Sequence, residues 1–147
     1  GPVVWGSDGS QADAINQTSE WSEAMQGGTQ PYIAMDGRAV FKWASGFIAD
    51  ATKKVLEVAQ LSPEELDVFI PHQANNRITD AMLRHLKLPE NVVVARTIKQ
   101  FGNNSAASVP MAMDQLLSTG QAKSGQTALL IGFGAGLVYA GQVVTLP

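Results

Sequence analysis

A histidine and an asparagine, each followed by further amide side chains, are the residues of this sequence best suited to chemistry on a carbonyl group. His72 lies in the run PHQANN at 71–76, and Asn103 lies in the run GNNS at 102–105. A neutral imidazole and a carboxamide can both donate hydrogen bonds to one carbonyl oxygen. Such donors stabilise an enolate as negative charge develops on that oxygen. A glycine-rich run at 132–136, GFGAG, could present a backbone N–H to a second oxyanion.

Each of these segments also has an ordinary structural interpretation. A single histidine such as His72 often serves structure rather than catalysis. The run around Asn103 is typical of a helix N-terminus, where side chains cap free N–H groups. The glycine-rich run fits a tight hairpin or bulge that needs positive φ, and it has no lysine to make it a phosphate loop. The coincidence of all three segments nevertheless favours one oxyanion-stabilising site.

The sequence offers no nucleophile for such a site. It contains no cysteine, so it has no thiolate, no disulfide and no cysteine metal ligand. Ser105 and Ser108 are nucleophile candidates only in principle, because no Gly-x-Ser-x-Gly motif surrounds either of them. No cluster of acidic residues has the spacing of metal ligands, so no metal site is predicted.

Strands and helices alternate along the chain, which predicts an α/β fold with a mixed β-sheet and helices on its faces. The predicted strands are 3–5, 68–70, 91–95, 127–131 and 137–145; the predicted helices are 36–59, 77–86 and 105–117, with one helical turn after Ser62. The strand at 91–95 is a continuous apolar run, as in strands buried on both faces. Since ligands bind beyond the carboxyl ends of parallel strands, we expect the three polar segments at one sheet edge.

The composition indicates one globular domain over residues 1–147. Apolar residues make up 45% of the chain and charged residues only 16%, and the net charge is −3. An acidic chain of this kind lacks the broad basic field that nucleic-acid binding requires. No apolar run has the length of a membrane span, and no signal peptide is recognisable, so we expect no membrane association.

The motifs together resemble the C-terminal half of β-ketoacyl-acyl-carrier-protein synthase III, a family of thiolase-fold condensing enzymes. The resemblance rests on VFIPHQANNRI at 68–78, FGNNSAASVP at 101–110 and IGFGAGLVYAGQVV at 131–144, with weaker likeness in WGSDGSQADAI at 5–15 and MDGRAVFKWA at 35–44. It implies a thiolase-like domain that forms one half of an αβαβα sandwich. The N-terminal half, which carries the reactive cysteine, is then expected to lie outside this sequence.

The resemblance also implies the reaction. In that family the cysteine takes an acyl group from acyl-CoA, and malonyl-carrier protein loses carbon dioxide to give an enolate that attacks it. His72 and Asn103 would then hold the malonyl thioester and stabilise the enolate. The backbone N–H of Ala135, at a position where many members have glycine, would form part of the oxyanion hole. Phe41 would line the tunnel to the cysteine, and neither a cofactor nor a metal would be needed.

Further expectations concern partners. Arg77 and Arg84 lie seven residues apart on one predicted helix face, and the resemblance implies that they and Lys42 dock the acidic acyl carrier protein; a merely solvated helix face is the alternative. Further implied partners are acyl-CoA, the N-terminal half and a second copy in a cytoplasmic homodimer. His85 is expected at the surface. Two alternatives remain: a related condensing enzyme of specialised metabolism, or a non-catalytic half that binds carrier protein. A half standing alone should expose apolar surface.

Overall fold

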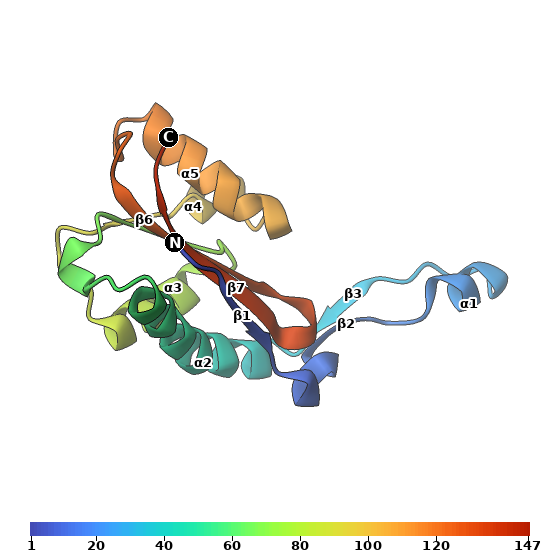
Figure 1. Cartoon of the computed structure of the whole chain (residues 1–147). Helices are drawn as coiled ribbons and strands as arrows, with labels where there is room; N and C mark the ends of the chain where they lie inside the picture. The colour runs from blue at the N-terminus through green and yellow to red at the C-terminus, as the bar shows by residue number, and fades with distance from the viewer.

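The computed structural model describes all residues from 1 to 147, and its centre is a five-stranded mixed sheet (Figure 1). Across the sheet the strand order is β1-β7-β6-β4-β5. The strands are β1 (Val4–Ser7), β4 (Val68–Pro71), β5 (Val93–Val94), β6 (Thr127–Gly134) and β7 (Val138–Thr145). β4 pairs in parallel with both β5 and β6, whereas β7 runs antiparallel to β6 and to β1. The expected α/β class with a mixed sheet is therefore confirmed.

Helices cover both faces of this sheet. α2 (Gly37–Val58) and α3 (Asn76–Leu86) pack on one face, and α5 (Ser108–Ser118) lies on the other beside the short α4 (Ile98–Phe101), as Figure 1 shows. Alternate residues of β4 supply the two cores: Phe69 belongs to the core under α2 and α3, while Val68 and Ile70 belong to the core under α5. No helix has both the length and the apolar character needed to cross a bilayer.

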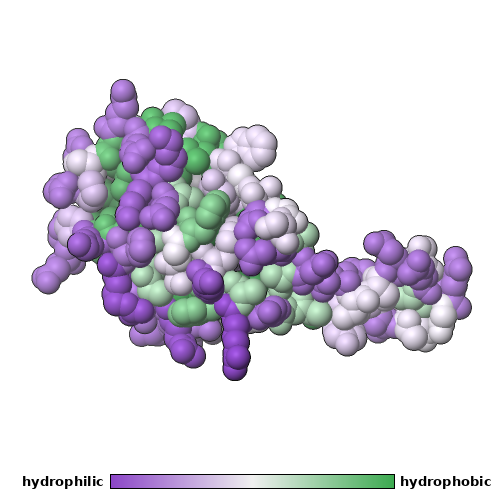
Figure 2. Space-filling model, turned by 90° about the horizontal axis from the view of Figure 1, so that it is seen from below, coloured by the Kyte–Doolittle hydropathy of each residue, from purple (hydrophilic) through white to green (hydrophobic).

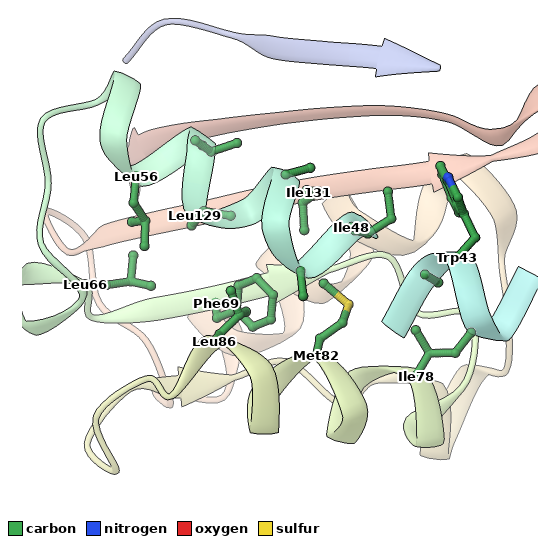
Figure 3. Close-up of a cluster of buried hydrophobic side chains, with 14 of the residues drawn as sticks. Trp43, Ile48, Leu56, Leu66, Phe69, Ile78, Met82, Leu86, Leu129 and Ile131 are labelled. Carbon is green, nitrogen blue, oxygen red and sulfur yellow. The ribbon is translucent and has the colours of Figure 1, made fainter. Parts of the chain in front are cut away.

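The larger core lies between the sheet and the α2–α3 pair (Figure 3). Ile78, Met82 and Leu86 recur at helical spacing on α3 and point into the core, where Leu86 lies beside Phe69 of β4 and Ile78 lies at the Trp43 end. Ile48 of α2 approaches the same space from the other helix. Burial of these side chains stabilises the fold by roughly 1.5–3 kcal/mol each, so this core fixes the position of α3 against β4.

Capping groups set the starts of both helices. The Asp36 carboxylate accepts hydrogen bonds from the backbone N–H groups of Arg38 at 3.0 Å and Ala39 at 3.1 Å, so α2 begins at Gly37. Asn75 caps α3 by accepting from the Arg77 N–H at 2.8 Å. The expected single turn after Ser62 is the 3₁₀ helix η2 (Pro63–Glu65). These boundaries follow the sequence signals for helix starts.

Two strands differ from the sequence prediction. β5 has only two residues, Val93–Val94, and both are half-buried because β5 is an edge strand that pairs with β4 alone. The expectation of a longer strand buried on both faces is therefore wrong. β6 is longer than predicted, since Gly132–Phe133–Gly134 continues the strand and pairs with β7 through Gly134 and Val138.

A hairpin arm projects from the body (Figures 1 and 2). It follows the 3₁₀ helix η1 (Gly9–Ala14) and consists of β2 (Ile15–Gln17), α1 (Trp21–Gln26) and β3 (Ile33–Met35), with β2 antiparallel to β3. The sequence predicted only a loop or short helix here, because strands of three residues are too short to show a period. Exposed apolar side chains gather on this arm: Trp21, Met25, Tyr32, Ile33 and Met35.

Candidate active site

The carboxyl ends of the three parallel strands meet at one edge of the sheet. Beyond the last paired residues, Pro71 and Ile131, the N–H of His72 donates to the carbonyl of Ile131 at 2.8 Å. On the other side of β4, the N–H of Ala95 donates to the carbonyl of Phe69 at 3.0 Å. The segments that follow β4, β5 and β6 therefore start side by side, at the edge where the polar motifs were expected.

His72 is partly buried and contacts residues from two other elements. Its Nδ1 lies 2.6 Å from Ser108 Oγ at the start of α5, and its ring packs edge-on against Phe133 of β6 with centroids 5.1 Å apart. Its Nε2 makes no hydrogen bond within the chain. Burial lowers the pKa of His72, because the charged imidazolium loses solvation. Burial therefore favours the neutral ring, in which one nitrogen is held and the other is free.

The buried side chain of Gln73 ties the end of β4 to the next two elements. Its Nε2 donates to the carbonyl oxygens of Pro71 at 2.8 Å and Ala95 at 3.2 Å, and its Oε1 accepts from the N–H of Ile98 at 3.2 Å. Ile98 begins α4, which leads directly into Gly102 and Asn103. The residue after His72 therefore also fixes the segment that carries Asn103.

Asn103 lies in an exposed turn between α4 and the 3₁₀ helix η3 (Ser105–Ala107). Gly102 permits this turn with φ of 70°. Asn103 Oδ1 accepts from the Ser105 N–H at 2.9 Å. Because an N–H can only donate, the bonded atom must be the oxygen, so the amide NH₂ is directed away from this bond. The NH₂ makes no hydrogen bond within the chain and is available to a ligand.

Ala135 opens the 3₁₀ helix η4 (Ala135–Leu137) at the end of β6. Positive φ occurs at the next two residues, Gly136 at 71° and Leu137 at 43°, but not at Ala135, so alanine is unstrained there. The first N–H of a helix has no partner within that helix. The glycine run is therefore a strand end with a hairpin turn, which agrees with its structural interpretation, and Ala135 lies four residues beyond Ile131, the last residue of β6 that pairs with β4.

Phe41 and Arg77 meet at a surface hollow of about 410 Å³. The Arg77 guanidinium carbon lies 5.8 Å from the centre of the Phe41 ring, and Gly37, Arg38 and Asn75 complete the lining. Asn75 comes three residues after His72, so the hollow adjoins the segment that carries the histidine. A larger hollow of about 490 Å³ is lined only by arm residues between Trp21 and Pro31, remote in sequence from every motif of the strand edge.

The three predicted docking residues, Lys42, Arg77 and Arg84, are exposed. The ion pairs of the chain involve other cations, namely Lys53, Lys54, His85 and Arg96. The predicted docking cations therefore have no carboxylate partner of their own. The exposed His85, as expected, lies at the surface, 3.4 Å from Asp50.

Sequence reasoning missed two supporting residues. Ser108 entered it only as a nucleophile candidate, and Gln73 only as a polar neighbour of His72. Ser108 lies 36 residues from His72, and no local pattern reports a contact of that separation. One signal could have identified both residues. A polar side chain that is expected to be buried needs a hydrogen-bond partner, so Gln73 and Ser108 could have been expected to hold neighbouring segments. No group of three or more histidine, aspartate or glutamate side chains is placed to hold a metal ion.

Comparison with known proteins relates the whole chain to one family. Residues 56–146 match the family described as 3-oxoacyl-[acyl-carrier-protein (ACP)] synthase III C terminal. The chain is 55% identical over its full length to β-ketoacyl-[acyl-carrier-protein] synthase III of Streptomyces glaucescens, of which it covers 45%. It spans about half the length of the curated relatives it matches.

Solved structures give the same answer. The priming β-ketosynthase of the R1128 polyketide biosynthetic pathway superimposes with a TM-score of 0.96 at 44% identity, covering 100% of this chain and 45% of that one. The 3-oxoacyl-(acyl carrier protein) synthase III of Pseudomonas aeruginosa gives 0.90 at 34% identity, covering 99% and 45%. With the strand-edge motifs in the same fold, the chain belongs to the 3-oxoacyl-[acyl-carrier-protein] synthase III C-terminal family.

Proposed function

We propose that this chain is the C-terminal catalytic half of a 3-oxoacyl-[acyl-carrier-protein] synthase III. In this proposal it works with an N-terminal half that supplies the cysteine absent from its own sequence. The reaction is the decarboxylative condensation of malonyl-carrier protein with an acyl group taken from acyl-CoA, which initiates fatty acid synthesis. Without the cysteine-bearing half, the chain forms no acyl-enzyme and does not condense.

The proposed steps use His72 and Asn103 as hydrogen-bond donors rather than as bases. The bond to the malonyl carboxylate breaks, carbon dioxide leaves, and the electron pair moves into the thioester to form an enolate. His72 Nε2 and the Asn103 amide donate to the enolate oxygen, where the charge develops. Loss of carbon dioxide needs no strong base, so a neutral histidine suffices.

The enolate carbon then attacks the acyl thioester on the cysteine. A new carbon–carbon bond forms, and the carbonyl oxygen becomes an oxyanion that accepts from the Ala135 N–H. Collapse of this intermediate expels the cysteine thiolate and leaves the 3-oxoacyl product on the carrier. Phe41 lines the tunnel through which the acyl chain and thioester reach the cysteine.

One observation carries the proposal: the 2.6 Å contact between His72 Nδ1 and Ser108 Oγ. Ser108 follows the Asn103 segment by one short 3₁₀ helix, so this contact supports the proposal that the histidine motif and the asparagine motif serve one site. The free NH₂ of Asn103 and the free Nε2 of His72 add support, because both are the donors that the mechanism needs.

The proposed partners follow from the same site. Lys42, Arg77 and Arg84 suit an acidic carrier protein because they carry positive charge with no carboxylate of their own. The hollow at Phe41 and Arg77 suits the thioester arm delivered by that carrier or by CoA. We further propose a homodimer of the whole enzyme, acting in the cytoplasm, where these substrates are made. No step of the mechanism requires a metal or a cofactor.

The experiment measures release of carbon dioxide from malonyl-carrier protein by the chain assembled with a cysteine-bearing half. We expect His72→Ala and Asn103→Ala each to reduce the rate by about 100- to 1000-fold, the usual effect of removing one oxyanion donor. His85→Ala and Asn104→Ala are matched controls, since each removes the same kind of side chain outside the proposed site. Unchanged rates in the two site variants would refute the assignment and favour a non-catalytic half that binds carrier protein.

A second candidate function is the priming step of a polyketide pathway. The observation favouring it is the match to the R1128 priming ketosynthase, whose TM-score of 0.96 exceeds the 0.90 of the Pseudomonas enzyme. The two candidates share the condensation and differ in which carrier protein and acyl-CoA they accept. Condensation rates with a fatty-acid carrier and with a polyketide carrier, measured side by side, distinguish them.

A further inference from the structure

Ser108 makes two contacts with the end of β4. Its hydroxyl oxygen lies 2.6 Å from His72 Nδ1, and it accepts a hydrogen bond from the backbone N–H of Gln73 at 3.2 Å. Only 1% of Ser108 is exposed, so water does not compete for this hydroxyl. A single buried oxygen at the start of α5 therefore contacts two consecutive residues of the histidine motif.

The number of hydrogens available to Ser108 Oγ decides which atom donates in its contact with His72 Nδ1. The Gln73 N–H can only donate, so it occupies a lone pair of Ser108 Oγ. The hydroxyl proton then needs an acceptor, because a buried donor without a partner is costly. Ser108 Oγ makes no hydrogen bond other than these two, so His72 Nδ1 is the available acceptor. In the opposite arrangement, with a proton on Nδ1, the Ser108 proton would have no acceptor.

We propose that Ser108 donates its hydroxyl proton to His72 Nδ1 and thereby holds His72 in the tautomer that carries its proton on Nε2. A neutral imidazole has one donor and one acceptor nitrogen, and the partner at one nitrogen decides the role of the other. Ser108 is then a positioning residue, because it touches His72 and not the substrate. The tautomer is a property of the chain itself, whereas its catalytic consequence rests on the proposed function.

The tautomer decides whether His72 can serve the proposed site. With the proton on Nε2, the free edge of the ring presents an N–H donor to an oxygen that gains negative charge. With the proton on Nδ1, the same edge would present a lone pair and repel that oxygen. The buried amide of Gln73 supports the arrangement, since its contacts with Pro71 and Ala95 hold the backbone N–H that orients Ser108.

The direct test is ¹⁵N NMR of the histidine ring in the folded chain at a pH above the histidine titration. The sequence contains only two histidines, and His85→Gln leaves His72 as the sole signal. Side-chain nitrogen shifts and two-bond proton couplings report which ring nitrogen carries the proton. We expect Nε2 to be protonated and Nδ1 to be a hydrogen-bonded acceptor. A proton on Nδ1, or equal populations of the two tautomers, would overturn the proposal.

Variants at position 108 test whether Ser108 sets the tautomer of His72. Ser108→Ala should shift the His72 ring toward a mixture of tautomers, whereas Ser108→Thr, which keeps the hydroxyl, should retain the Nε2–H form. A folded Ala variant with an unchanged tautomer, or a folded Thr variant that behaves like Ala, would overturn the role of Ser108. Should either substitution prevent folding, the spectrum of the chain with Ser108 intact still decides the tautomer.

The rate of decarboxylation by the assembled enzyme shows whether a failure lies in the role of Ser108 or in the proposed function. We expect Ser108→Ala to slow carbon dioxide release by about 10- to 100-fold, as when the outer partner of a metal-bound histidine is removed, with Ser108→Thr restoring most of the rate. If His72→Ala abolishes release while Ser108→Ala has no effect, the role of Ser108 is wrong and the function stands. If neither variant slows release, the function fails, while NMR still decides the tautomer.

Discussion

The side-chain oxygen of Asn103 is held at 2.9 Å by the backbone N–H of Ser105, and this bond determines which end of the amide remains free. Asn104, with φ −98° and ψ 27°, sets the peptide plane that carries the Ser105 N–H, and Ser105 itself adopts a left-handed φ of 50°. Such a conformation is uncommon outside glycine and asparagine. The turn therefore uses local backbone geometry to present an NH₂ group outward.

Asn103→Asp tests this arrangement because the carboxylate keeps the acceptor for Ser105 but replaces the donor with a second, negatively charged oxygen. We expect decarboxylation by the assembled enzyme to fall by at least the 100- to 1000-fold typical of a lost oxyanion donor. The unfolding midpoint should change little. Asn104→Asp is the matched control for added charge, and an equal loss of rate in both variants would argue against a specific role for Asn103.

The lowered pKa of His72 predicts a pH dependence of stability. Burial favours the neutral ring in the folded state, so the unfolded chain binds more protons below the ordinary histidine pKa of 6.5. The contribution of His72 to the free energy of unfolding is complete above that pKa. It decreases as the pH falls toward the folded-state pKa.

Urea unfolding measured between about pH 8 and pH 5 checks this dependence. His72→Gln should lose less stability than the natural chain over that interval. The carboxylates are the same in both proteins, so their contribution cancels in the comparison. Parallel curves for the natural chain and His72→Gln would contradict the burial argument.

The exposed cations predict how carrier protein binds. Arg77→Ala and Arg84→Ala should each weaken binding, and the effect should shrink as salt is added, because exposed charges act largely through screened long-range attraction. Arg77→Ala should have the larger effect, since it also removes the contact with Phe41. Titration calorimetry at low and high salt measures both. Lys123→Ala, an exposed cation after α5, is the control, and equal weakening there would indicate mere loss of net charge.

A side chain at position 141 is expected to overpack the core where α2 crosses the sheet. A Cβ at this position would lie 2.7 Å from Val55 Cγ2 and 3.2 Å from the Leu130 carbonyl. Gly141→Ala should therefore destabilise the fold by about 1–3 kcal/mol, the usual cost of overpacking. Gly46→Ala is the matched control, because Gly46 lies within α2 with nothing within 4 Å; it should stabilise by about 0.5–1 kcal/mol. Urea unfolding measures both, and equal effects would contradict the packing argument.

The exposed apolar residues of the hairpin arm lead us to expect that copies of the chain associate with one another. Ile33 and Met35 lie on the same side of β3, and 77% and 62% of their surfaces are exposed. The chain on its own should self-associate, because exposed apolar surface of this kind is favourably covered. Sedimentation velocity should give a dimer or larger species that becomes monomeric in the double variant Ile33→Ser, Met35→Ser. Val58→Ser on α2 is the control, and a natural chain that sediments as a monomer would contradict the prediction.

Most of the fold was predictable because its signals are local. The helix predicted over residues 36–59 has apolar residues at helical spacing, and the structure gives α2 over Gly37–Val58 with Asp36 as its cap. Continuous apolar runs identified β4 and the start of β6. The errors in strand length came from pairing, which the sequence does not show. β5 is short because it lies at the sheet edge, and β6 continues through its glycines because β7 pairs with them.

The sequence nominated the principal residues of the candidate site, whose catalytic roles stay predictions, but it did not reveal the residues that support them. His72 is recognisable because a polar run directly after a strand is unusual, Asn103 because it lies in a second polar run after a glycine, and family likeness gave each a role. The contact of Ser108 with His72 depends on how α5 packs against β4, a relation between segments far apart in sequence. The arm was missed for a related reason. β2 and β3 have only three residues each, and they form strands because they pair with each other, which no local sequence pattern shows.

The pairing of β1 with β7 has a consequence for how the protein is made. Val4 is aligned with Gly141, so β1 has no hydrogen-bond partner in the sheet until β7, more than 130 residues later, has been synthesised. The nascent protein can assemble β4, α3 and β6 while Val4–Ser7 waits, and closing so long a loop is slow. The pairing of β1 with β7 is therefore a late step in the assembly of this sheet, because Trp5 and its neighbours join it only after β7 is available.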